Sequence, residues 1–182
     1  MKKKYRFSLN NKKVWVAGHT GMVGSAILKR LSKEKCKILT IEQSCLDLTN
    51  QTKTETWIKK NKPDVVFIAA ARVGGILANS NNQSEFLYDN LMIQNNVIKA
   101  SADNDVKKLI FLGSSCIYPK ISSQPIDEKQ LMKGPLEDTN EGYALAKIAG
   151  LKLCSYLYKE KKKDFISLMP TNLYGPGDNY DL

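Results

Sequence analysis

Residues 13–31 read KVWVAGHTGMVGSAILKRL, and this stretch decides the fold. It begins with a short apolar run, 13–17, and continues into residues 18–24, where glycine occupies the first, fourth and seventh positions. Apolar side chains then recur at the spacing of one helix face, at Val23, Ile27, Leu28 and Leu31. The pattern predicts a buried strand, a tight glycine turn and a helix.

A GxxGxxG pattern at a strand-to-helix turn is typical of a dinucleotide-binding site. The first glycine permits the turn, another lets the backbone approach a pyrophosphate, and the last lets helix and strand pack closely. The helix N-terminus then supplies amide donors for the phosphates. We therefore expect the whole loop to bind the cofactor, with His19 hydrogen-bonding inside it: Gly18, His19, Thr20, Gly21, Met22, Val23 and Gly24.

One acidic residue ends the second predicted strand, 37–42, and another follows it. Glu42 lies about where an acidic residue binds the adenosine ribose hydroxyls, and a carboxylate there would favour NAD over NADP. The alternative for Glu42 is a solvated strand end. Asp47 can contact the adenine, or it can cap the helix predicted to start near Gln51.

Further strands are predicted at 65–69, 108–112 and 165–169, separated by long helices that include 85–103. Strands and helices that alternate with long crossovers predict a doubly wound parallel sheet, with ligands at the carboxyl ends of the strands. The small residues 70–75 leave room there for a cofactor. Asn90 and Asn95 are interpreted as solvated positions of the long helix.

The composition of the 182 residues favours one globular domain, 13–182, after a basic flexible tail, 1–12. The net charge of +10 comes mainly from scattered lysines, so it does not indicate nucleic-acid binding. Four cysteines without a CxxC pair are expected to be reduced thiols of a cytoplasmic protein. A single histidine gives little support for a metal site, and no apolar run is long enough to span a membrane.

Tyr143 and Lys147 lie four residues apart at the start of an apolar helix, so they share one face. An ammonium near a phenol lowers the phenol's pKa from about 10 and suits it to proton transfer with an alcohol. Tyr158 and Lys162 have the same spacing, but they lie in a lysine-rich stretch that is typical of a solvated helix end. We expect the helix of Tyr143 to be capped within residues 139–141.

Residues 113–119, GSSCIYP, follow a predicted strand. Ser114 or Ser115 can polarise a substrate carbonyl, and Cys116 can exchange a proton with a carbon acid if its pKa is lowered. The alternative is a small-residue turn with a buried thiol. The polar stretch 120–141 can fold over this site.

The glycine loop, the serine loop, the YxxxK pair and the PTN motif at 170–172 together resemble the extended short-chain dehydrogenase/reductase family. Within it, the runs AGHTGMVGSAI, FLGSSCIYPK, YALAKIAG and MPTNLYGP are similar to a nucleotide-sugar epimerase-reductase. The resemblance implies an NADPH-dependent enzyme that takes GDP-4-keto-6-deoxy-mannose, inverts C3 and C5, and then reduces the C4 ketone. It also implies a homodimer for the full-length protein.

The resemblance further implies a role for each matching residue. Tyr143 protonates the C4 oxygen, and Lys147 lowers the pKa of Tyr143 and holds the nicotinamide ribose. Ser114 orients the ketone, and Cys116 is the epimerisation base. The remaining matches would line the cofactor: Leu112, Gly113, Ser115, Pro170, Thr171, Asn172 and Leu173.

The chain also departs from the family. Members have a C-terminal domain that holds the GDP-sugar and a second epimerisation residue, a histidine, so we expect the chain to be truncated at Leu182. Thr20 and Gln43 replace arginines that bind the 2′-phosphate, so we expect NADPH to bind weakly and NAD to be possible. Two alternatives stay open: another nucleotide-sugar epimerase or dehydratase, and a non-catalytic dinucleotide-binding module.

Overall fold

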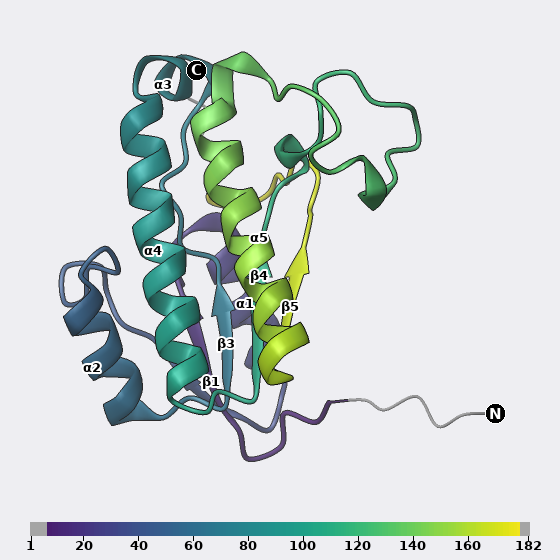
Figure 1. Cartoon of the computed structure of the whole chain (residues 1–182). Coiled ribbons are helices and arrows are strands. Elements are labelled where there is room, and N and C mark those ends of the chain that lie inside the picture. Colours follow the sequence, from purple (N-terminus) through teal and green to yellow (C-terminus); the bar gives the residue numbers. More distant parts are fainter. Residues whose placement is uncertain (1–6, 179–182) are drawn as a thin grey trace.

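The computed structural model describes residues 7–178, within which five parallel strands form one sheet with helices on both faces (Figure 1). The strand order is β2-β1-β3-β4-β5. The strands and helices alternate along the chain, and their bounds are β1 Lys13–Ala17, α1 Met22–Leu31, β2 Lys37–Leu39, α2 Gln51–Asn61, β3 Val65–Ile68, α3 Ile76–Asn81, α4 Gln83–Asp103, β4 Lys108–Leu112, α5 Glu141–Lys161 and β5 Asp164–Leu168. The predicted doubly wound parallel sheet is confirmed.

The two faces of the sheet are packed by different sets of side chains. Trp15 and Val66 point toward the face covered by α2, α4 and α5, where they meet Ile58 and Val97. Val14 and Val65 point to the opposite face, which α1 covers. Neighbouring residues of a strand alternate between the faces, so a strand buried on both sides reads as a continuous apolar run.

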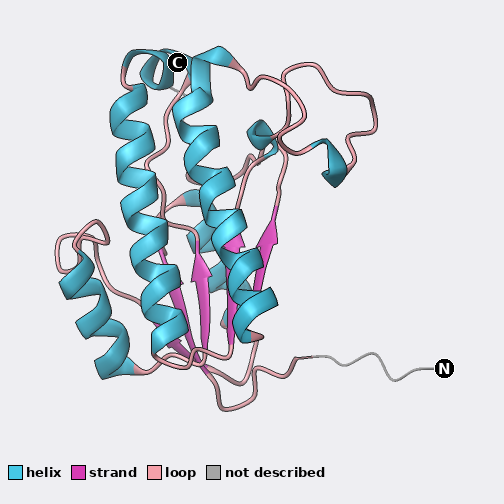
Figure 2. Cartoon of the chain, viewed as in Figure 1, coloured by secondary structure: helices cyan, strands magenta, loops and turns pink. Residues whose placement is uncertain are grey.

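The strands run in register, so their carboxyl ends lie at one edge of the sheet (Figure 2). Ala17 pairs with Ile68, and Leu112 pairs with Leu168. The loops that carry the predicted site residues all leave from this edge. Parallel pairing therefore brings segments far apart in the sequence to one place.

Some elements differ from the sequence prediction. The second strand ends at Leu39, so Glu42 lies in the loop that follows it. The short helix α3 and three 3-10 turns, η1 Ser115–Ile117, η2 Glu128–Gln130 and η3 Asp138–Asn140, were not predicted. They are too short to give a periodic pattern. None of the described helices is long and apolar enough to cross a membrane.

The first six residues of the predicted tail lie outside the described part of the chain. From Phe7 onward the chain lies against the domain. The Lys108 ammonium lies 5.2 Å from the centre of the Phe7 ring. Leu9 packs on the α1-side core, and the Asn11 amide donates to the Lys35 carbonyl.

Candidate active site

A cleft of about 1220 Å³ opens at the carboxyl ends of the strands. Its volume exceeds the range usual for a site that holds one small ligand, about 300–1,000 Å³, and suits an elongated one. All predicted site residues except Glu42 line it: Gly18, His19, Thr20, Gly21, Met22, Val23, Gly24, Asp47, Leu112, Gly113, Ser114, Ser115, Cys116, Tyr143, Lys147, Pro170, Thr171, Asn172 and Leu173.

Each glycine of the loop has its own geometry. Gly18 has a φ of +82°, and a Cβ there would lie 2.5 Å from the Ala70 amide nitrogen. A Cβ on Gly24 would lie 2.0 Å from the Gly18 carbonyl oxygen, so only glycine allows α1 to approach the turn. A Cβ on Gly21 would meet nothing closer than 3.7 Å. The middle glycine therefore keeps open space in the wall of the cleft.

The N-terminus of α1 fits a phosphate. Gly21 is its N-cap residue, and glycine has no side chain to accept a hydrogen bond from the first turn. The first backbone amides of a helix have no partner within the helix, and with the helix dipole they attract an anion. The residues present therefore fit the pyrophosphate of a dinucleotide.

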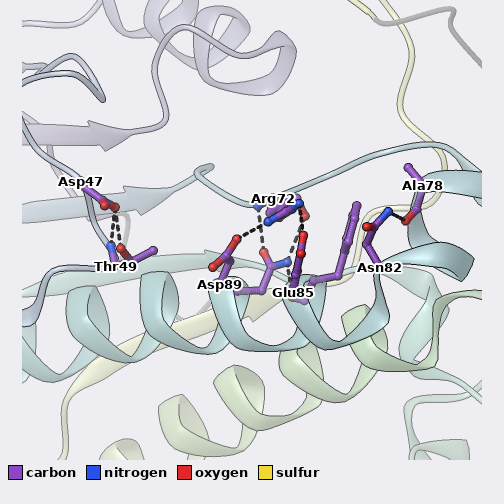
Figure 3. Close-up of polar contacts among 9 residues, drawn as sticks. Asp47, Thr49, Arg72, Ala78, Asn82, Glu85 and Asp89 are labelled. Atoms are coloured by element: carbon purple, nitrogen blue, oxygen red, sulfur yellow. Dashed lines mark hydrogen bonds and ion pairs between the residues drawn. The ribbon is translucent and has the colours of Figure 1, made fainter.

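The loop after β2 forms the other side of this end of the cleft. Ile41, Gln43 and Asp47 line the cleft, whereas the Glu42 carboxylate lies 3.1 Å from the Nε2 atom of His19. Asp47 accepts hydrogen bonds from the backbone and hydroxyl of Thr49 (Figure 3). Asn50, and not Asp47, caps α2, because its side chain accepts from the Lys53 amide.

Asn90 of α4 fixes the loop after β3. This side chain is buried, accepts from the Arg72 amide and donates to the Arg72 carbonyl. The Arg72 guanidinium in turn donates to Asp89 and Glu85, each at 2.6 Å (Figure 3). Reading Asn90 as solvated was wrong, because a lone polar residue on a helix gives no signal of the loop that it meets.

Lys147 and Tyr143 meet in the wall of the cleft. The Lys147 ammonium is almost fully buried, donates to the Leu112 carbonyl at 3.0 Å and lies 5.4 Å from the centre of the Tyr143 ring. Burial lowers the pKa of Lys147 to about 8. Burial raises the pKa of Tyr143, and the nearby Cys116 adds to this. The expected fall in the pKa of Tyr143 is therefore not found, because the loss of water around the phenol disfavours the phenolate.

The serine loop brings a hydroxyl and a thiol to the same cleft. Ser114 is the N-cap residue of η1, and its oxygen accepts from the Cys116 amide at 3.4 Å. Burial raises the pKa of Cys116, while the hydrogen bond to Ser114 and the charge of Lys147 act in the opposite direction. In this structure the thiol is therefore the main form of Cys116 at neutral pH.

Two glutamines of α4 position α5, and neither was predicted as part of the site. Gln83 accepts from the Gly142 amide and donates to the Asp138 carbonyl, so it caps α5 from a neighbouring helix. Asn140 is the N-cap residue by position, but its side chain makes no capping bond. Gln94 donates to the carbonyl of Ala146, the residue before Lys147.

Three residues of the cleft wall carry buried polar atoms without a partner in the described part of the protein. These atoms are the Trp15 Nε1, the Asn79 Oδ1 and the Asn140 Oδ1. Unpaired buried polar atoms are uncommon in folded proteins and call for an explanation such as a water molecule or a ligand. Their gathering along one cleft agrees with a site for a polar ligand.

The chain matches one family model and several curated relatives. The model of the NAD dependent epimerase/dehydratase family matches residues 14–182. The chain is 54% identical to GDP-L-fucose synthase of Sinorhizobium fredii over 97% of its own length and 56% of that protein. It is 46% identical to the GDP-L-fucose synthase of Escherichia coli over 94% of its own length and 54% of that protein. The chain therefore spans slightly more than half the length of these relatives.

Solved structures agree with this result. MlghC, a GDP-mannoheptose C4 reductase from Campylobacter jejuni with NADP bound, is 38% identical and superimposes with a TM-score of 0.90 over 96% of this chain and 55% of its own. A GDP-L-fucose synthetase from Naegleria fowleri bound to NADP is 31% identical, with a TM-score of 0.88 over 98% of this chain and 60% of its own. The chain belongs to the NAD dependent epimerase/dehydratase family.

Proposed function

We propose that this chain forms the cofactor-binding and catalytic part of a GDP-L-fucose synthase. The reaction inverts C3 and C5 of GDP-4-keto-6-deoxy-mannose and then reduces its C4 ketone with NADPH. One observation carries the proposal: Ser114, Cys116, Tyr143 and Lys147 line a single cleft together with the glycine loop. The names of the relatives support the same substrate class and the same reduction.

The cofactor would lie along the cleft. The glycine loop and the N-terminus of α1 would hold the pyrophosphate, and residues 112–115 and 170–173 would line the nicotinamide half. Lys147 would hold the nicotinamide ribose. When bound, NADPH supplies the hydride that reduces the C4 ketone.

Tyr143 would act as the proton donor of the reduction. Because burial raises the pKa of Tyr143, the phenol carries its proton at neutral pH, and a developing alkoxide on C4 can take that proton. Ser114 would donate a hydrogen bond to the same oxygen and polarise the ketone. Lys147 would stabilise the phenolate that remains, because its ammonium lies beside the ring.

Cys116 would move the protons at C3 and C5. Those protons are acidic only while C4 is a ketone, so both inversions must precede the reduction. The thiolate would take the proton from one face of the carbon, and inversion requires a second group, the histidine that the resemblance implies for the family, to give a proton to the opposite face. The ammonium of Lys147 favours the thiolate, although burial opposes it.

A deuterium experiment tests this assignment. In D₂O, an active full-length form should incorporate deuterium at C3 and C5 of the keto-sugar, and Cys116→Ser should abolish incorporation. If Cys116→Ser incorporates at the normal rate, the thiol is not the base, and another nucleotide-sugar epimerase or dehydratase becomes the better assignment.

Cofactor titration tests the binding step with the present chain. We expect NADPH to bind this chain, and we expect no oxidation of NADPH when the keto-sugar is added, because the 182 residues span only slightly more than half the length of the curated relatives. NADH that binds tenfold tighter than NADPH, about 1.4 kcal/mol, would reject NADPH as the natural cofactor. A full-length form that binds NADPH but never turns over would favour a non-catalytic binding module.

We also propose a cytoplasmic homodimer. Tyr88 of α4 and Leu145 and Tyr156 of α5 are large exposed side chains on adjacent helices, and a second copy could cover them. All four cysteines are unpaired thiols, as expected in a reducing compartment. Sedimentation at several concentrations tests the oligomeric state, and a monomer at all of them would contradict the dimer.

A further inference from the structure

The adenosine end of the cleft contains a pair of side chains that the proposed reaction does not use. The Nε2 atom of His19, in the glycine loop, lies 3.1 Å from a carboxylate oxygen of Glu42, in the loop after β2. A carboxylate can only accept, so the imidazole donates. The His19 side chain is 13% exposed and the Glu42 side chain 61% exposed, so the pair spans the rim of the cleft.

An exposed polar pair of this kind contributes little to folding, typically less than about 1 kcal/mol. Its position gives it another consequence. In this fold, an acidic residue after the second strand accepts hydrogen bonds from the ribose hydroxyls and repels a 2′-phosphate. Here that carboxylate is turned to His19, and Glu42 is not part of the cleft wall.

The basic side chains of the cleft lie away from Glu42 and leave His19 as its partner. Within residues 7–178, the lysine and arginine side chains that line the cleft are Arg72 and Lys147. Arg72 lies after β3 and is held by Asp89 and Glu85, and Lys147 lies on α5 beside Tyr143. Neither belongs to the β1 and β2 loops, where Gln43 and Asp47 complete the wall.

We propose that the His19–Glu42 pair determines whether a cofactor with a 2′-phosphate is accepted. By donating to Glu42, His19 holds the carboxylate away from the ribose, so a 2′-phosphate is tolerated without an arginine. Without His19, Glu42 is free to turn toward the ribose, where it accepts from unphosphorylated hydroxyls and repels the phosphate. This inference rests on the proposed binding of NADPH.

A double-mutant cycle tests the pair. Dissociation constants for NADPH and NADH are measured by calorimetry on this chain, on His19→Ala, on Glu42→Gln and on the double variant. His19→Ala should weaken NADPH binding about tenfold and change NADH binding less than about threefold, a size typical of losing one hydrogen bond to a charged group. Glu42→Gln should not weaken NADPH binding. When Glu42→Gln is already present, adding His19→Ala should change NADPH binding little. Glu34→Gln, which removes an equal charge that pairs with Arg30 away from the cleft, serves as the control.

The outcomes separate the pair from its alternatives. If His19→Ala weakens the binding of NADPH and NADH equally, His19 only supports the conformation of the glycine loop. A full His19→Ala penalty in the Glu42→Gln background would show that His19 acts on the phosphate without Glu42. Either result overturns the inference. If the unmodified chain binds neither cofactor, the proposed function fails first and the inference fails with it; if it binds NADPH and the variants do not differ, only the inference fails.

Discussion

The two ends of α5 carry the same tyrosine–lysine spacing in opposite environments. Near the N-terminus, Tyr143 is half-buried and Lys147 is 3% exposed, with its ammonium bound to the Leu112 carbonyl. At the C-terminus, Tyr158 is 57% exposed. Lys162 lies just past the helix, where its ammonium donates to the Lys159 carbonyl. Spacing puts two side chains on one face of a helix, but only the neighbours of that face decide what the pair can do.

The neighbours differ because only the first part of α5 is held against the cleft. Gln83 and Gln94 of α4 bind the backbone at Gly142 and Ala146, and the carboxyl end of β4 receives the Lys147 side chain. The last turn instead carries Lys159 and Lys161 and ends in an αL residue, an ordinary solvated helix end. Changes at matched positions of the two ends should therefore have very different effects.

The largest difference is expected from removing the two phenol hydroxyls. In a full-length form that reduces the keto-sugar, Tyr143→Phe should lower kcat roughly a thousandfold, within the range for loss of a general acid. Tyr158→Phe should change it less than about twofold, because an exposed hydroxyl far from the cleft has no role in the reaction. NADPH oxidation followed by absorbance measures both. Similar losses for the two variants would contradict the assignment of Tyr143.

The second difference concerns the two ammonium groups and pH. The pKa of Lys147 in the folded protein is about 8, below its ordinary 10.5, so the unfolded chain binds more protons between these values and stability rises with pH there. Below pH 8 Lys147 is charged in the folded protein, so the free energy of unfolding is lowered there by the full cost of burying this charge. Lys147→Met should therefore stabilise the fold at pH 7 by about 3 kcal/mol, at about 1.4 kcal/mol per pKa unit, less the value of the bond to Leu112.

The gain from Lys147→Met should shrink as the pH rises from 8 toward 10.5. Lys162→Met, at the solvated end, should change stability by less than about 0.5 kcal/mol at any pH. Denaturation midpoints at several pH values measure both variants. A gain from Lys147→Met that is independent of pH would indicate better packing rather than loss of a buried charge.

The third difference concerns how closely α4 and α5 approach. A Cβ on Gly150 would lie 2.7 Å from the Phe111 ring and 2.9 Å from the Gln94 amide. Gly150→Ala should therefore destabilise the protein by about 1–2 kcal/mol, although alanine favours a helix over glycine. Lys159→Ala, near the exposed end, should be neutral. Chemical denaturation measures the free energy of unfolding of both variants. If Gly150→Ala is more stable than the unmodified protein, the Phe111 and Gln94 side chains move aside at little cost.

The smallest effects of single changes are expected at the two helix caps. Gln83→Ala removes the acceptor of the Gly142 amide and should cost about 1 kcal/mol, as does loss of an ordinary N-cap. Lys162 has a φ of +54°, so Lys162→Gly should instead stabilise the protein by up to about 1 kcal/mol. Thermal unfolding of the two variants should therefore shift in opposite directions. A neutral Gln83→Ala would mean that water caps α5 equally well.

Much of the site was predictable because its signals are local. The glycine loop, the serine loop and the Tyr143–Lys147 pair each consist of neighbours in sequence, and parallel strands bring their ends to one edge. Gln83, Asn90 and Gln94 were not predictable as parts of the site. Each is a single polar residue on a helix, and its meaning depends on a backbone group far away in the sequence.

By itself, the sequence determined the order of strands and helices, the parallel sheet and the loops at its edge, because hydrophobic periodicity and glycine conformation act over a few residues. Only the tertiary structure decided the charges within the cleft. It turned Glu42 toward His19, buried the Lys147 ammonium and raised the pKa of Tyr143. A protonation state depends on the water that a side chain loses and the partners that it gains, and distant parts of the chain supply both.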